Sequence, residues 1–230
     1  MILVATGLKR EARILAGPDA RVVAGGGDSR RLEQELDTAA QGAVGVISMG
    51  LCGALAAGLR PGDWVVASEV MLAASVSVGW DERSEKWAAA LAERLNARLG
   101  PVLGSHAMLS DADAKRAAHQ ATGAIAVDME SQVAAAVAAR HGLPFAVARV
   151  VSDAADRSLP TAAQAGMAPD GGMDIGAVLR ALAADPRQLP ALIRVGREAE
   201  TAFRALGRGR DLLGPGLGRP DFDQLLLDVV

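Results

Sequence analysis

The 230-residue chain carries 24 basic and 27 acidic side chains, giving a net charge of −3, and half of its residues are apolar. This composition excludes a disordered chain, and the negative charge argues against general binding of nucleic acid. The length suits one domain with a sizeable core. The single cysteine, Cys52, excludes an internal disulfide framework and fits a reducing compartment.

The sequence has no uncharged apolar run of 18 residues and no N-terminal segment with the order of a secretion signal. We therefore expect a cytoplasmic protein without a membrane-spanning segment.

The apolar pattern predicts strands that alternate with helices along the chain. Strands are expected over residues 2–6, 22–24, 44–48, 64–68, 70–77, 102–109, 124–127 and 145–151. Helices are expected over residues 9–16, 30–40, 86–99, 111–120, 129–141, 175–184 and 189–206. Loops are expected over 50–62 and 160–172, and a C-terminal tail over 211–230. The alternation predicts an α/β fold, a three-layer sandwich with a central mixed β-sheet flanked by helices, formed by residues 1–210.

Two acidic residues lie where this fold would bring them together. Glu130 opens a predicted helix, and Asp153 comes just after the strand that follows. Ligands of open α/β sheets collect at the carboxyl ends of strands, where two carboxylates can divide binding and proton donation between them. Each also has an ordinary explanation, as an acid at a helix start or a turn cap. Glu11, one turn into the first predicted helix, reads locally as a solvated carboxylate.

The remaining motifs allow a structural explanation beside a functional one. Glycines at 50, 53 and 58 would let backbone N–H groups approach a ligand, but they also suit an ordinary turn. Cys52 has no histidine near it in sequence, which favours a small buried residue over a nucleophile. The three histidines share no metal-ligand spacing, so we expect no metal site; of these, His106 falls near the expected pocket.

The segments DMES, HGLPFAVARVVSDAAD and GLCGALAAGLRPGDWVVASE resemble the nucleoside phosphorylase / 5′-methylthioadenosine nucleosidase family. Within it, the segment DPRQLPALIRVGREAETAFRAL is most similar to the hopanoid-associated phosphorylases, which act on adenosylhopane, an adenosine with a triterpene at its 5′ position. The resemblance implies cleavage of the N-glycosidic bond of a 5′-substituted adenosine, preferably adenosylhopane, in hopanoid biosynthesis. The alternatives are a methylthioadenosine/S-adenosylhomocysteine nucleosidase and a nucleoside-binding protein without turnover.

The resemblance also implies roles for individual residues. Asp153 would protonate the purine at N7, with Ser152 placing it. Glu130 would accept hydrogen bonds from the ribose hydroxyls, with Met129 against the sugar. Glu11 matches the carboxylate that activates water in the nucleosidases. The residues expected to border the purine or the acceptor are Met108, Leu109, His106, Gly50, Leu51, Cys52 and Gly53.

One departure from the family concerns the acceptor of the sugar. The bacterial purine phosphorylases carry an arginine two residues before the loop glycine, where this chain has Ser48. Arg10 and Arg13 are the candidates to supply a cation for phosphate, whereas Glu11 together with Ser48 favours water. The acceptor stays open between phosphate and water, and no cofactor is expected apart from phosphate as a co-substrate.

The resemblance implies that the protein forms a homo-oligomer. It also implies that the ligand is a small nucleoside, either free or lipid-linked. Residues 187–210 hold six Arg and two Glu. They also carry an apolar stripe of Leu189, Leu192, Val195, Ala199, Ala202 and Leu206. A basic amphipathic helix of this kind either packs on its own domain or lies on a membrane surface, which would place the protein at the periphery of the inner membrane.

Overall fold

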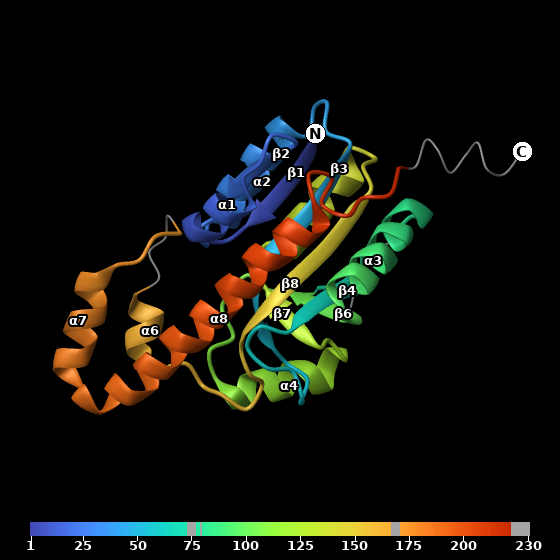
Figure 1. Cartoon of the computed structure of the whole chain (residues 1–230). Coiled ribbons are helices and arrows are strands. Elements are labelled where there is room, and N and C mark those ends of the chain that lie inside the picture. Colours follow the sequence, from blue (N-terminus) through green and yellow to red (C-terminus); the bar gives the residue numbers. More distant parts are fainter. Residues whose placement is uncertain (73–76, 79, 167–170, 222–230) are drawn as a thin grey trace, which may run out of the picture.

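The structure is a computed structural model that describes residues 1–72, 77–78, 80–166 and 171–221 (Figure 1). Its strands are β1 (Ile2–Thr6), β2 (Ala20–Ala24), β3 (Gly45–Ala54), β4 (Trp64–Met71), β5 (Ser77–Val78), β6 (Arg98–Gly104), β7 (Ala126–Asp128) and β8 (Phe145–Asp153). Its helices are α1 (Lys9–Leu15), α2 (Ser29–Ala39), α3 (Glu82–Leu95), α4 (Ala112–Thr122), α5 (Ser131–Arg140), α6 (Thr161–Ala165), α7 (Ile175–Ala184) and α8 (Leu189–Leu213), with a 3₁₀ turn η1 (Pro186–Gln188) before α8.

The strands of the described ranges form one mixed sheet, as predicted. Its order is β2-β1-β3-β7-β6-β4-β5, and β8 pairs with both β3 and β4. The β8 pairing is parallel to β3 and antiparallel to β4, so β3, β7, β6, β4 and β8 are linked in a closed ring of pairings. This closure brings the end of β8 next to the ends of β3 and β7.

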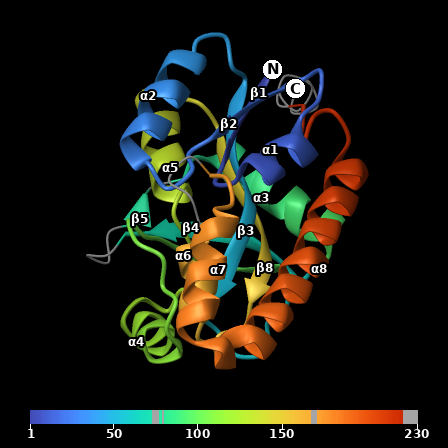
Figure 2. The ribbon, with the colours of Figure 1, turned by 90° about the vertical axis from the view of Figure 1, so that its left-hand side faces the viewer.

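Helices cover both faces of the sheet (Figure 2), which confirms the predicted layers. Leu3 of β1 packs in the same cluster as residues of α2 and α5. Ile2 and Val4 instead pack in the cluster that holds residues of α1, α3 and α8. Successive side chains of a strand point to opposite faces, so the apolar runs supply both cores at once.

The boundaries of helix α3 differ from the prediction over 86–99. Asp81 caps its N-terminus with a side-chain hydrogen bond, and Asn96 ends it in a left-handed conformation with φ of 48°. Leu99, which continued the apolar spacing, lies instead in β6 and is 52% exposed. The period-four pattern therefore ran four residues past the true helix end.

The glycine-rich segment expected as a loop over 50–62 begins instead as a strand, because β3 continues to Ala54. Asp153 likewise belongs to β8 rather than following it. A short helix, α6, lies in the segment 160–172 that was expected to be a loop. Part of the strand expected over 70–77 lies outside the described residues.

The last helix extends past residue 210. It ends at Leu213 rather than Leu206, and Gly214 follows it. The indole N–H of Trp87 then donates a 3.0 Å hydrogen bond to the carbonyl of Leu217, which is fully buried. The described part of the expected tail thus packs on α3. None of the helices in the described ranges is long and apolar enough to cross a membrane.

Candidate active site

Among the described residues, acidic side chains are buried where several strands of the sheet end. Glu11 comes shortly after β1, Asp128 ends β7, Glu130 follows it, and Asp153 ends β8. Each of these residues is less than a tenth exposed. A buried carboxylate is costly unless it is paired or hydrogen-bonded, so the partners of these groups define the site.

Glu11 is anchored through both carboxylate oxygens. Its Oε2 accepts hydrogen bonds from the hydroxyl of Thr6 (2.7 Å) and from the amides of Gly7 (2.9 Å) and Leu8 (2.6 Å). Its Oε1 accepts one from the amide of Leu51 (2.7 Å). The local interpretation as a solvated carboxylate is therefore wrong. Among the residues that the structure describes, Oε1 accepts from one donor, and it keeps capacity to accept a second hydrogen bond.

A fully buried arginine, Arg149 of β8, joins the acids on this side of the site. Its Nε lies 3.0 Å from Oδ2 of Asp128, and its Nη2 lies 3.1 Å from Oε2 of Glu130. Nη2 also donates to the hydroxyl of Ser48, and Nη1 donates to the carbonyl of Leu51 (3.3 Å). Burial opposes the charged form, but Asp128 and Glu130 raise the pKa of Arg149 above its ordinary value, so the guanidinium is charged.

Glycines leave the room in which these groups meet. A Cβ added to Gly50 would lie 2.8 Å from Oε1 of Glu11 and 3.0 Å from Nη1 of Arg149. A Cβ added to Gly7 would lie 2.8 Å from Oε1 of Glu130. Gly50 therefore lies in a strand and allows close approach of side chains, rather than forming the ordinary turn considered above; approach of its backbone to a ligand stays a prediction.

Asp128 holds the turn that carries Glu130. Its Oδ1 accepts hydrogen bonds from the amides of Glu130 (3.0 Å) and Ser131 (2.7 Å), and its Oδ2 accepts one from the hydroxyl of Ser131. Burial raises the pKa of Glu130 to about 7; Arg149 lowers it, and Asp128 and Glu11 raise it further. Glu130 therefore gains or loses its proton near neutral pH.

Asp153 pairs with a different cation. Its Oδ2 accepts a hydrogen bond from the ammonium of Lys115, which is fully buried on α4, and its Oδ1 accepts one from the hydroxyl of Ser152 (2.6 Å). The ammonium also donates to the carbonyls of Ala154 (3.1 Å) and Arg157 (2.9 Å). Lys115 thus fixes both the carboxylate and the chain that leaves β8.

A break in strand register explains how Ser152 reaches Asp153. Val151 pairs with Cys52, but Gly53 pairs with Asp153, which leaves Ser152 as an extra residue. Adjacent side chains of a regular strand point to opposite faces, whereas a bulge can turn both to one side. A Cβ added to Gly53 would lie 3.3 Å from Oδ2 of Asp153, so the backbone of the partner strand β3 also lies close to this carboxylate.

The other predicted residues surround these groups less closely. Cys52 is buried, and burial raises the pKa of its thiol well above the ordinary value, which fits a small packed residue rather than a nucleophile. His106 is exposed, and its Nδ1 lies 3.2 Å from the side-chain amide of Gln132. Leu109 packs beside a small apolar cluster, and Met108 and Met129 are half-buried. Contact of His106, Met108, Leu109 and Met129 with a substrate stays a prediction.

The sequence interpretation did not identify Arg149, Lys115 or Asp128. A lone basic residue inside the apolar run FAVARVV of a buried strand was a usable signal, because a buried cation needs acidic partners. Lys115 gave no such signal, since Arg116 beside it is exposed and only the helix orientation separates them.

The arginines considered for phosphate binding lie elsewhere. Arg10 pairs with Glu200 at 2.7 Å and sits 4.0 Å above the ring of Phe203, and Arg13 is exposed. Among the described residues, the buried cations of the site are Arg149 and Lys115 instead.

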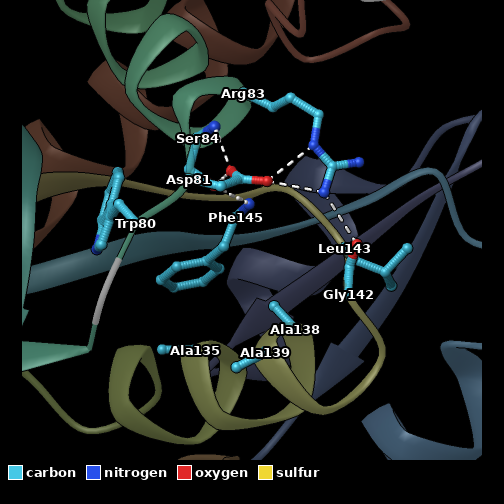
Figure 3. Close-up of a pocket in the computed structure, with 10 residues that line it drawn as sticks. All are labelled: Trp80, Asp81, Arg83, Ser84, Ala135, Ala138, Ala139, Gly142, Leu143 and Phe145. Carbon is cyan, nitrogen blue, oxygen red and sulfur yellow. Dashed lines mark hydrogen bonds and ion pairs between the residues drawn. The ribbon is translucent and has the colours of Figure 1, made fainter.

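A pocket of about 170 Å³ lies between α3 and α5, away from these acids (Figure 3). Phe145 lines it, at the opposite end of β8 from Asp153. Its charged groups bind neighbouring groups: Asp81 accepts hydrogen bonds from Ser84 and Arg83, and Arg83 donates to the carbonyl of Gly142. We assign the site to the acids at the strand ends, not to this pocket.

Solved structures with the same fold include several nucleosidases. A 5′-methylthioadenosine/S-adenosylhomocysteine nucleosidase of Helicobacter pylori is 14% identical, with 100% of this chain and 98% of that chain covered and a TM-score of 0.62. An S-adenosylhomocysteine nucleosidase of Streptococcus pyogenes is 20% identical over 67% and 85% of the two chains, with a TM-score of 0.56. A futalosine hydrolase of Helicobacter pylori is 17% identical over 66% and 87%, with a TM-score of 0.56.

A comparison with curated proteins gives no match. The family model described as the phosphorylase superfamily matches residues 31–184, which include Asp128, Glu130, Arg149 and Asp153. This match confirms the predicted family and the enzyme class, nucleoside phosphorylase or nucleosidase. The chain therefore belongs to the phosphorylase superfamily.

Proposed function

We propose that this protein cleaves the N-glycosidic bond of a 5′-substituted adenosine and releases adenine. The observation that carries the proposal is the pair of buried acidic sites at one end of the sheet, Asp153 on one side and Glu130 with Glu11 on the other. The solved nucleosidases with this fold support it; the Streptococcus pyogenes structure was determined in complex with 5-methylthiotubericidin.

In the proposed reaction, Asp153 passes a proton to N7 of the purine while the bond between the sugar and the base breaks. The base then leaves neutral, and positive charge develops on the ribose. Glu130 accepts hydrogen bonds from the ribose hydroxyls, and the excess of carboxylates around Arg149 stabilises the cationic sugar electrostatically. Met129 packs against the sugar, and Met108, Leu109 and His106 border the purine.

We propose water rather than phosphate as the acceptor. Arg149 is the buried cation beside Glu11, but its charge is already shared by Asp128 and Glu130. A phosphate dianion placed there would meet an excess of negative charge, whereas a water molecule would not. Oε1 of Glu11, with its remaining acceptor capacity, is then the base that takes a proton from water.

For the 5′ substituent we propose the triterpene of adenosylhopane, which places the reaction in hopanoid biosynthesis. The support is the resemblance of residues 185–206 to the hopanoid-associated phosphorylases. Methylthioadenosine or S-adenosylhomocysteine is the second candidate substrate, supported by the named nucleosidases that share the fold. A bulky apolar substituent requires an open apolar exit from the ribose site, whereas a methylthio group requires only a small closed one.

The test is release of adenine from adenosylhopane, methylthioadenosine and adenosine, each with and without phosphate. We expect release from adenosylhopane that does not require phosphate. Preference for methylthioadenosine would replace the proposed substrate, and a requirement for phosphate would replace the proposed acceptor. Tight binding of all three without release would support the nucleoside-binding protein instead.

We also propose that the α7–α8 hairpin, residues 173–197, binds an anionic membrane surface. Figure 1 shows it standing away from the sheet, and its exposed apolar residues are Met173, Ile175, Leu179, Leu189 and Ile193. Its exposed arginines, which form no ion pair with any described residue, are Arg180, Arg187, Arg194 and Arg197. The exposed acids of the hairpin are Asp174 and Asp185, so the surface is basic and apolar together, the combination that anionic lipid headgroups attract.

Co-sedimentation with vesicles tests this surface. We expect the protein to bind phosphatidylglycerol vesicles but not phosphatidylcholine vesicles, and the double variant Leu189→Ser/Ile193→Ser to lose binding. Leu212→Ser is the control, because Leu212 is 56% exposed on the same helix but lies outside the hairpin. Equal sedimentation of the double variant and the wild type would contradict the proposal.

A further inference from the structure

We propose that Lys115 supplies the proton that Asp153 passes to the leaving purine, so that Lys115 is a positioning residue acting through the acid. The proposal rests on the proposed function, because it concerns the source of the proton for base release. It starts from a question of geometry in the site: a general acid must donate a proton, yet both carboxylate oxygens of Asp153 already accept hydrogen bonds, one from the ammonium of Lys115 and one from the hydroxyl of Ser152.

The surroundings of Asp153 offer a short list of proton donors. Its two oxygens accept hydrogen bonds from Lys115 and from Ser152. Arg149, the other buried cation in the described part of the chain, faces Asp128 and Glu130. A serine hydroxyl is a far weaker acid than an ammonium group, so Lys115 is the neighbour able to release a proton.

The hydrogen bonds of Lys115 suit both of its protonation states. As an ammonium group it has three N–H donors, and these meet Asp153, the carbonyl of Ala154 (3.1 Å) and the carbonyl of Arg157 (2.9 Å). After one proton moves to Asp153, the amine keeps two N–H groups for the two carbonyls. Its lone pair then accepts a hydrogen bond from the new carboxyl O–H, so no buried polar group loses its partner.

The step balances in charge and atoms. The bond between the sugar carbon and the purine nitrogen breaks, and its electron pair stays with the purine. The ammonium of Lys115 first gives a proton to the carboxylate of Asp153, and N7 then takes that proton from the resulting carboxyl. The products are neutral adenine, a carboxylate, a neutral amine and a cationic sugar, and water later returns a proton to the amine. Because Asp153 and Lys115 start as a neutral pair, proton transfer between them leaves no net charge buried.

The experiment varies the leaving group, since only a purine needs the proton. Adenine release from the adenosine that the wild type cleaves is compared with release of p-nitrophenolate from p-nitrophenyl ribofuranoside, whose leaving group departs as a stable anion. We expect Lys115→Met to lower kcat for adenine release by roughly 10²-fold or more, with KM little changed. Release of p-nitrophenolate should stay within a few-fold of the wild type.

Lys115→Arg separates proton supply from charge. An arginine keeps the positive charge and the hydrogen bond to Asp153 but does not give up a proton. We expect it to lose adenine release as Lys115→Met does, and recovery to near the wild-type rate would overturn the proposal. Equal losses on both substrates would also overturn it, as would a drop in both rates in Lys115→Arg.

Two controls complete the design. Arg116→Met changes the next residue of α4, which is exposed and pairs with Asp113 on the surface, and should leave both rates unchanged. Should Lys115→Met not fold, the Lys115→Arg comparison alone decides. A wild type that releases no adenine from any nucleoside would refute the proposed function itself, an outcome visible before any variant is made.

Discussion

The two sides of the site balance buried charge differently. On one side, which we call the sugar side, Glu11, Asp128 and Glu130 gather around a single cation, Arg149. On the other, the purine side, Asp153 has Lys115 to itself. The sugar side therefore holds an excess of negative charge, whereas the purine side is neutral as a pair.

This difference matches what each side has to do in the proposed reaction. An excess of carboxylates attracts a developing positive charge without moving a proton. A neutral acid–ammonium pair can move a proton at little electrostatic cost. Burial is the main cause of the raised pKa of Glu130, about 7, and the neighbouring acids Asp128 and Glu11 raise it further against the opposing effect of Arg149.

The largest expected effect is on the purine side. Asp153→Asn keeps the shape of the side chain but removes the proton donor, so the rate of adenine release should fall by about 10²–10⁴-fold. The thermal unfolding midpoint, recorded with the rate, should show a folded protein. Near-wild-type turnover in this variant would remove Asp153 from the mechanism and with it the comparison between the two sides.

Replacing Arg149, the cation of the sugar side, should lower the free energy of unfolding. Arg149→Met leaves the surrounding carboxylates without a partner, which should cost about 3–5 kcal/mol in the free energy of unfolding measured with denaturant at pH 8. The loss should shrink at pH 5.5, where Glu130, whose pKa is raised to about 7, takes up a proton.

Arg140→Met is the control for that variant. Arg140 pairs with Glu33 and Asp37 on the surface, where screened ion pairs contribute little. A similar loss of stability in both variants would contradict the conclusion that Arg149 stabilises the buried carboxylates of the sugar side.

Glu130 should give the sugar side a pH dependence of its own. Its folded pKa of about 7 lies above its ordinary value of 4.5, so the folded state holds this proton more tightly. The stability it contributes is present in full below pH 4.5 and is lost as the pH rises to about 7, by on the order of 3 kcal/mol. Glu130→Gln should lack that decline in denaturation measured from pH 4 to 8, and an unchanged decline would refute the raised pKa.

The smallest effects should come from the glycines of β3, which probe how tightly each side is packed. A Cβ on Gly50 would lie 2.8 Å from Glu11, whereas a Cβ on Gly53 would lie 3.3 Å from Asp153. Gly50→Ala should therefore cost about 1–3 kcal/mol in unfolding free energy, and Gly53→Ala less. The reverse order in a denaturant titration of both variants would show that the purine side is the more tightly packed of the two.

Local patterns predicted the fold more fully than the site. The spacing of apolar residues was enough to predict buried strands such as Ile2–Thr6 and amphipathic helices such as Ile175–Ala184. Boundaries were missed where a tertiary contact overrides spacing, as at Leu99, which continues the helical pattern but lies in a strand. Gly50 and Gly53 suggested a loop, yet the pairing of β3 with β8 keeps both in the strand.

The sequence allowed the acids Glu130 and Asp153 to be predicted as site residues, but not their basic partners. Glu130 and Asp153 follow predicted strands, so topology alone brings them near each other. Lys115 belongs to a helix whose orientation on the sheet depends on packing, and nothing in its neighbours separates a buried lysine from an exposed one. Ser48 stands where the bacterial purine phosphorylases carry an arginine, and here its hydroxyl accepts a hydrogen bond from Arg149 of the adjacent strand.

The extra residue in β8 bears on how this protein tolerates change in chain length. Ser152 is accommodated because Val151 and Asp153 pair with consecutive residues of β3. Deleting Ser152 would make the pairing of β8 with β3 regular. It would also move the side chain of Asp153 to the opposite face of the sheet, away from Lys115. The direction of the Asp153 side chain thus depends on the number of residues that precede it in β8. Deletions in this strand should be far less tolerated than substitutions that keep the count.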